Sequence, residues 1–155
     1  MARTLPGLLG IVACVFAATH SRADDGRIEI SATCAAVSCF AGDAAGYPVT
    51  ITAPGSYVLT SDLALPAATS GVVIQTDDVH VDLNGFSIRG PASCAPGACS
   101  TAGALVGVGR VGAGGAARCS VRGGSIVGID GTGIRLSSAS RVENVLVSSV
   151  TNRGI

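Results

Sequence analysis

Between residues 77 and 84, polar side chains alternate with aliphatic ones, and several of the polar residues are of types that can do chemistry. His80 and Asp82 alternate with Val79 and Val81, so in a strand they project to the face opposite the valines. An imidazole beside a carboxylate can transfer protons or hydrogen-bond to sugar hydroxyls. The spacing therefore predicts a polar row along the outside of a strand.

Three arginines fall beside this row when later strands are aligned with it. The alignment gives three columns of like residues: Val81, Cys119 and Ser140; Leu83, Val121 and Val142; and Ile88, Ile126 and Val147. It places Arg118 beside His80, Ser120 and Arg141 near Asp82, and Arg122 and Glu143 near Asn84. The ligand-binding residues that we expect are His80, Asp82, Arg118, Arg122 and Arg141. Guanidinium groups grip carboxylates at two points, so the row suits acidic sugars. The alternative is a solvated face with cross-strand charge pairs.

The elements that position this row repeat along the chain. Gly133-Ile134 and Gly154-Ile155 open two units that are 21 residues apart (154 − 133). A fixed period of this kind indicates a solenoid, in which each coil completes the core of its neighbour. We therefore predict an all-β fold, a right-handed parallel β-helix of few coils. Asn84-Gly85 is also typical of a hairpin in a β-sandwich, but hairpins do not explain the repeated Gly-Ile starts.

The N-terminus has the pattern of an export signal. An arginine precedes a short apolar run, and small residues near position 23 suit a signal peptidase, so residues 1–23 are expected to be a signal peptide. Cleavage at Cys14 with lipid anchoring is the alternative. Residues 24–46 are expected to form an irregular N-terminal cap, and residues 47–155 the coils. Insertions are expected at 89–102 and 107–117. The Gly spacing at 107–112 lacks a following helix, so it predicts a loop and not a dinucleotide site.

Five cysteines remain after removal of the signal. In an exported protein they are expected to form disulfides, and we predict Cys34–Cys39 and Cys94–Cys99, each closing a short loop. Cys119 lies in a strand pattern and is expected to be a free, buried, small apolar residue. A zinc site is the alternative, but no His lies near any cysteine.

The composition limits the kinds of partner. Beyond the signal, eight arginines (10 − 2) face ten Asp and Glu residues, a net charge of −2, which gives no basic field for nucleic acid. No later apolar run is long enough to span a membrane. No motif for a metal or a cofactor stands out, so neither is expected.

Three segments resemble a known group of proteins. They are Pro-Gly-Ser-Tyr-Val-Leu-Thr-Ser-Asp-Leu (54–63), Asp-Val-His-Val-Asp-Leu-Asn-Gly-Phe-Ser-Ile (78–88), and a leader with Cys-Phe-Ala-Gly-Asp (39–43) and Gly-Tyr-Pro-Val-Thr-Ile (46–51). Over about residues 28–155 the chain resembles bacterial exported right-handed parallel β-helix repeat proteins of the pectin-lyase-like group. The resemblance implies the fold and not an activity, since the group includes polysaccharide lyases, hydrolases, epimerases and many members without assigned activity.

These observations predict a secreted or periplasmic, non-catalytic scaffold that binds a polysaccharide or a cell-envelope partner. The alternative is a fragment of a polysaccharide lyase or epimerase whose active site lies on coils absent from this chain. The sequence ends at the start of a coil without a polar cap, so we expect a truncated solenoid. Self-association through the open C-terminal coil is expected to follow.

Overall fold

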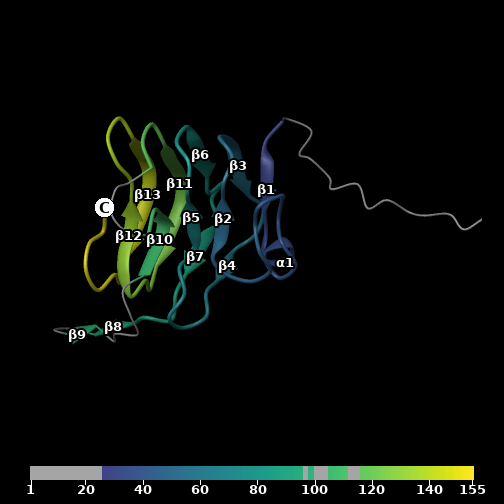
Figure 1. The fold of residues 1–155 in the computed structure, drawn as a ribbon. Coiled ribbons are helices and arrows are strands. Elements are labelled where there is room, and N and C mark those ends of the chain that lie inside the picture. Colours follow the sequence, from purple (N-terminus) through teal and green to yellow (C-terminus); the bar gives the residue numbers. More distant parts are fainter. Residues whose placement is uncertain (1–25, 96–97, 100–104, 112–115) are drawn as a thin grey trace, which may run out of the picture.

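The computed structural model describes residues 26–95, 98–99, 105–111 and 116–155. They form a parallel β-solenoid of about four turns, as the repeat predicts (Figure 1). The predicted signal peptide and Cys14 lie outside the described residues. In the part of the chain that the structure describes, no helix is long and apolar enough to cross a membrane.

Two parallel sheets make up the solenoid. The first, sheet A, contains β1 (Ile28–Ile30), β3 (Gly55–Leu59), β4 (Leu63–Ala64), β6 (Val79–Asp82), β7 (Ser87–Arg89), β11 (Ser120–Val127) and β13 (Arg141–Ser148). The second, sheet B, contains β2 (Val49–Ile51), β5 (Val72–Ile74), β10 (Leu105–Gly109) and β12 (Gly131–Arg135). The long strand β11 pairs with both β6 and β7, so these two short strands belong to one coil. Asn84-Gly85 therefore connects two strands of one coil and does not close a hairpin.

The core consists of columns of aliphatic side chains from successive coils. Val79, Val81 and Leu83 are fully or almost fully buried, whereas His80 is exposed and Asp82 half-buried, as their alternation predicts. Full burial of one such aliphatic side chain stabilises the fold by about 1.5–3 kcal/mol. Tyr57 is the only aromatic side chain among the fully buried residues of the described core, which otherwise consists of aliphatic and small side chains.

Two of the three predicted columns, Val81 with Cys119 and Leu83 with Val121, are wrong by two residues, and this shift moves the polar row. Val81, not Leu83, pairs with Val121, a step of 40 residues (121 − 81), whereas Ile88 pairs with Ile126, a step of 38 (126 − 88). The turn at 83–86 is two residues longer than the matching part of β11. The later pairs Val121–Val142 and Ile126–Val147 are as predicted.

A column of glycines lets sheet B approach sheet A. A Cβ atom on Gly107 would lie 2.5 Å from the carbonyl oxygen of Gly133 and 2.6 Å from Cγ2 of Ile126. Gly71 is confined in the same way by Gly107 and Ile88. Residues 107–109 were predicted to lie in an insertion loop, and this is wrong, because they are part of β10. Only glycine leaves room for the neighbouring coil there.

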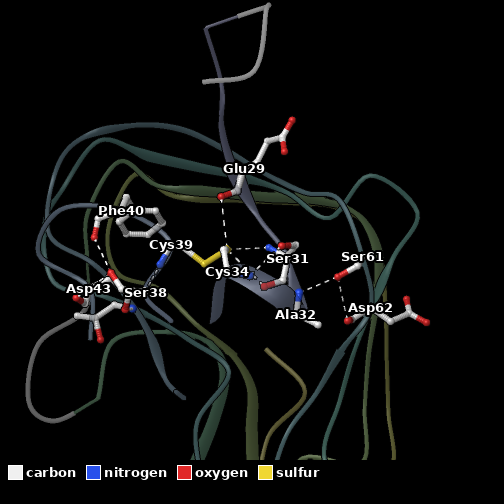
Figure 2. Close-up of a disulfide and its surroundings, with 11 residues drawn as sticks. Glu29, Ser31, Ala32, Cys34, Ser38, Cys39, Phe40, Asp43, Ser61 and Asp62 are labelled. Atoms are coloured by element: carbon white, nitrogen blue, oxygen red, sulfur yellow. Dashed lines mark hydrogen bonds between the residues drawn. A yellow bond between two sulfur atoms is a disulfide. The ribbon is translucent and has the colours of Figure 1, made fainter. Parts of the chain in front are cut away.

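The N-terminal end of the solenoid is covered by a compact cap (Figure 2). Ser31 caps the N-terminus of the short helix α1 (Ala32–Ala35), and its Oγ accepts a hydrogen bond from the Cys34 N–H. The Cys34–Cys39 disulfide joins this helix to the following loop. The Asp43 carboxylate holds that loop against the first coil, since it accepts hydrogen bonds from the N–H groups of Cys39 (3.0 Å) and Thr50 (2.8 Å).

The second disulfide lies on a projection from the solenoid. Strands β8 (Cys94–Ala95) and β9 (Ala98–Cys99) form a small antiparallel ribbon, visible below the coils in Figure 1, and Cys94–Cys99 joins them. Cys119 is free and buried. Both predicted disulfides and the free cysteine are thus confirmed.

Candidate functional site

The five predicted ligand-binding residues lie around one open groove on the outer face of sheet A. The groove has a volume of about 450 Å³ and crosses β3, β6, β11 and β13. Its polar lining comes from Arg27, Ser56, His80, Asp82, Arg118, Ser120, Arg122, Arg141 and Glu143. Parallel stacking therefore brings together side chains that are up to 116 residues apart (143 − 27).

The register places different neighbours in the row from those predicted. Ser120 pairs with His80, and Arg122 pairs with Asp82. Arg118, predicted beside His80, lies at the corner before β11 and contacts Asp78. The cause is the longer turn at 83–86, which displaces the alignment by two residues. Asn84 accordingly lies beyond the groove, in the turn.

His80 has serine neighbours on both adjacent coils. Its Nδ1 lies 2.9 Å from Oγ of Ser120, and Ser56 occupies the matching position on β3. Ser120 is followed on the next coil by Arg141. The sequence alignment missed the serines, although the two extra residues of the Asn-Gly turn would have revealed them. This row offers hydroxyl and imidazole groups that can both donate and accept hydrogen bonds.

Asp82 is the most strongly bound carboxylate of the groove. Its Oδ2 accepts hydrogen bonds from Nη2 (2.8 Å) and Nε (3.1 Å) of Arg122, and from Nη1 of Arg27 at 3.1 Å. Its Oδ1 accepts the N–H of Asn84 at 2.9 Å. Burial raises the pKa of Asp82, but the Asn84 N–H and the two guanidinium groups together lower the pKa below its ordinary value. Asp82 is therefore ionised at neutral pH and serves as an anchor for both arginines.

Arg118 closes one end of the groove through a two-point ion pair. Its Nε and Nη2 each lie 2.8 Å from a carboxylate oxygen of Asp78, and Nη2 also lies 3.4 Å from Asp77. These hydrogen bonds lower the pKa of Asp78 and raise that of Arg118. Arg118 has a positive φ of 53°, and Ala139, at the matching position of the next coil, has a φ of 55°. Positive φ values are uncommon for non-glycine residues. The hydrogen bonds to Asp78 hold the Arg118 side chain at this corner.

Arg141 and Glu143 occupy the outer end of the groove. Nη1 of Arg141 lies 3.2 Å from Oε1 of Glu143, and the Arg141 side chain is 73% exposed. An exposed pair of this kind is worth about 0–1 kcal/mol, so a ligand carboxylate can compete for this guanidinium. Of the four groove arginines, Arg141 is therefore the one that a ligand carboxylate can bind most readily.

Each arginine of the groove is paired with at least one carboxylate. Among the described residues, no group of three or more His, Cys, Asp or Glu side chains is placed to hold a metal ion. Cys119 lies beneath the groove, where burial raises the pKa of its thiol. The arrangement presents hydrogen-bonding groups in a row along sheet A.

The fold and the groove define a parallel β-solenoid with an open polar face. No protein-family model, curated protein or solved structure was found to match this chain.

Proposed function

We propose that the chain is an exported, non-catalytic β-solenoid that binds a polysaccharide in the sheet A groove. The observation that carries the proposal is the row Ser56, His80, Ser120 and Arg141, one polar residue from each of four adjacent strands. Adjacent strands are about 4.8 Å apart, so an extended polymer lying across them would meet a hydrogen-bonding group at every coil.

An acidic polysaccharide suits the groove better than a neutral one. Hydroxyl groups of the sugar would bond to the serines and to His80, and a carboxylate would displace Glu143 from Arg141. Of the four groove arginines, Arg141 is held only by an exposed pair with Glu143, so an anionic ligand is expected to bind there. Two disulfides in the chain support an extracellular or periplasmic location.

The proposal is tested by affinity electrophoresis of the chain in gels containing pectate, alginate or a neutral glucan. We expect retardation in pectate or alginate that is lost in His80→Ala and Arg141→Ala. Arg89→Ala is the matched control, because Arg89 is exposed on β7 and does not line the groove. Equal retardation of all three variants would show that the groove is not the binding site.

A further inference from the structure

A second basic surface lies on the sheet B side of the solenoid, and its charges are not matched. Arg110 follows β10, Arg135 ends β12, and Arg153 lies on the next stretch of chain, where it bridges to Thr132. The Arg110 N–H donates a hydrogen bond to the carbonyl oxygen of Arg135 at 3.1 Å, so the backbones of these two arginines are adjacent. Within the described residues, none of the three arginines takes part in an ion pair.

Two hollows adjoin these arginines. A small one of about 90 Å³ contains Arg110 and Arg135. A larger one of about 470 Å³ contains Arg135 and Arg153 and extends across the last coil to Val142 of sheet A. Thr132 and Asn152 line both hollows and add neutral hydrogen-bonding groups. Neither lining includes an Asp or a Glu among the described residues, in contrast to the groove on sheet A.

We propose that Arg110, Arg135 and Arg153, with Asn152 and Thr132, form a binding site for a phosphate group. A guanidinium group presents a planar fork of donors that fits phosphate oxygens, and it stays protonated at every relevant pH. The three guanidinium groups carry three positive charges, and one carboxylate can neutralise only one of them. A phosphate group has three acceptor oxygens and up to two negative charges, so it matches this site better. The small hollow has room for such a group.

The proposal is independent of the sheet A groove. It is tested by titrating the ¹⁵N-labelled chain with inorganic phosphate at low ionic strength and following the arginine Nε–H signals. We expect saturable shifts of the Arg110 and Arg135 signals. The dissociation constant should rise about tenfold in Arg135→Gln and in Arg110→Gln, because each variant removes charge-assisted hydrogen bonds.

Controls separate a site from general attraction of anions. Arg89→Gln removes an exposed arginine elsewhere and should leave phosphate binding unchanged, whereas Arg135→Lys keeps the charge without the fork and should give an intermediate loss. Circular dichroism checks that each variant keeps its β signal. Absence of saturable shifts, or an equal loss in Arg89→Gln and Arg135→Gln, would overturn the proposal.

Co-sedimentation with vesicles identifies the source of the phosphate. The phosphate belongs to an anionic lipid headgroup if the wild-type chain sediments with phosphatidylglycerol vesicles but not with phosphatidylcholine vesicles. In that case the Arg135→Gln variant should sediment with neither. If only inorganic phosphate binds, with the variant pattern above, the ligand is a soluble phosphate. Both results support the site.

Discussion

Nδ1 of His80 and Oγ of Ser120 lie 2.9 Å apart on adjacent coils, although 40 residues separate them in the sequence. Their contact is a consequence of the register between β6 and β11, and it places the only histidine of the described residues in the middle of the polar row. Ser–His pairs also occur in catalytic sites, so the charges around this pair decide which activity we expect of the chain.

The chain is expected to show no lyase, hydrolase or epimerase turnover on pectate or alginate. Catalysis on an anionic sugar needs a positioned base and a stabiliser of the developing charge, whereas Arg122 and Arg118 are held by carboxylates. The check is the absorbance of unsaturated products, with and without Ca²⁺. Turnover that disappears in His80→Ala or Arg122→Ala would favour the lyase or epimerase alternative.

Gly107→Ala is expected to destabilise the solenoid by about 1–3 kcal/mol, because its methyl group would press on Gly133 and Ile126 of the core. Gly154 provides a matched control in the same column of the last coil, where a Cβ atom would lie 3.9 Å from Val147 Cγ1. Gly154→Ala should change the free energy of unfolding by less than about 0.5 kcal/mol. Urea denaturation measures both, and equal costs would contradict the close approach of the sheets.

Asp82→Asn is expected to lower the free energy of unfolding by about 1 kcal/mol at pH 7, since it removes the anchor of two arginines. The folded-state pKa of Asp82 lies below its value in the unfolded chain, so this stabilisation is complete above that unfolded value and is lost as the pH falls through the folded pKa. The difference between the wild type and Asp82→Asn should therefore shrink below about pH 4. Glu143→Gln, which breaks an exposed pair, should lower the free energy of unfolding by less than about 0.5 kcal/mol. A loss of unfolding free energy in Asp82→Asn that does not change with pH would rule out the ionic explanation.

The 155-residue chain is expected to self-associate through β13. This strand pairs only with β11 in the described structure, and Leu146 on it is 64% exposed, so it is an open edge. Leu146→Lys should shift the sedimentation profile toward monomer, because a charged edge resists pairing. Val37→Lys, at a 72% exposed site in the N-terminal cap, should have no effect. A wild-type chain that stays monomeric at all concentrations tested would refute this.

Local patterns predicted the fold, whereas the exact register depended on a turn. Alternation of Val79, His80 and Val81 correctly separated the core face from the polar face. The alignment between coils failed at Asn84-Gly85, because two additional residues in a turn change the pairing without changing the hydrophobic pattern. The same cause hid the Ser120 contact of His80.

The glycine-rich composition around residue 107 led to the prediction of a loop where the structure has strand β10. Gly107-Val108 has the same place in its coil as Gly133-Ile134, but its neighbours Gly109 and Gly112 gave it the composition of a loop. A glycine that permits close packing and a glycine that permits a turn cannot be told apart from sequence alone. The contact of Arg27 with Asp82, over 55 residues, was equally hidden, because it depends on how the N-terminal cap sits on the first coil.

The proposed binding groove is tested most directly by locating the bound polysaccharide. Backbone amide signals of the ¹⁵N-labelled chain should be followed during titration with oligogalacturonate. We predict saturable shifts centred on Ser56, His80 and Ser120, with the β2 amides, buried in sheet B, unchanged. Saturation without shifts in that row, or shifts confined to sheet B, would contradict polysaccharide binding in the sheet A groove.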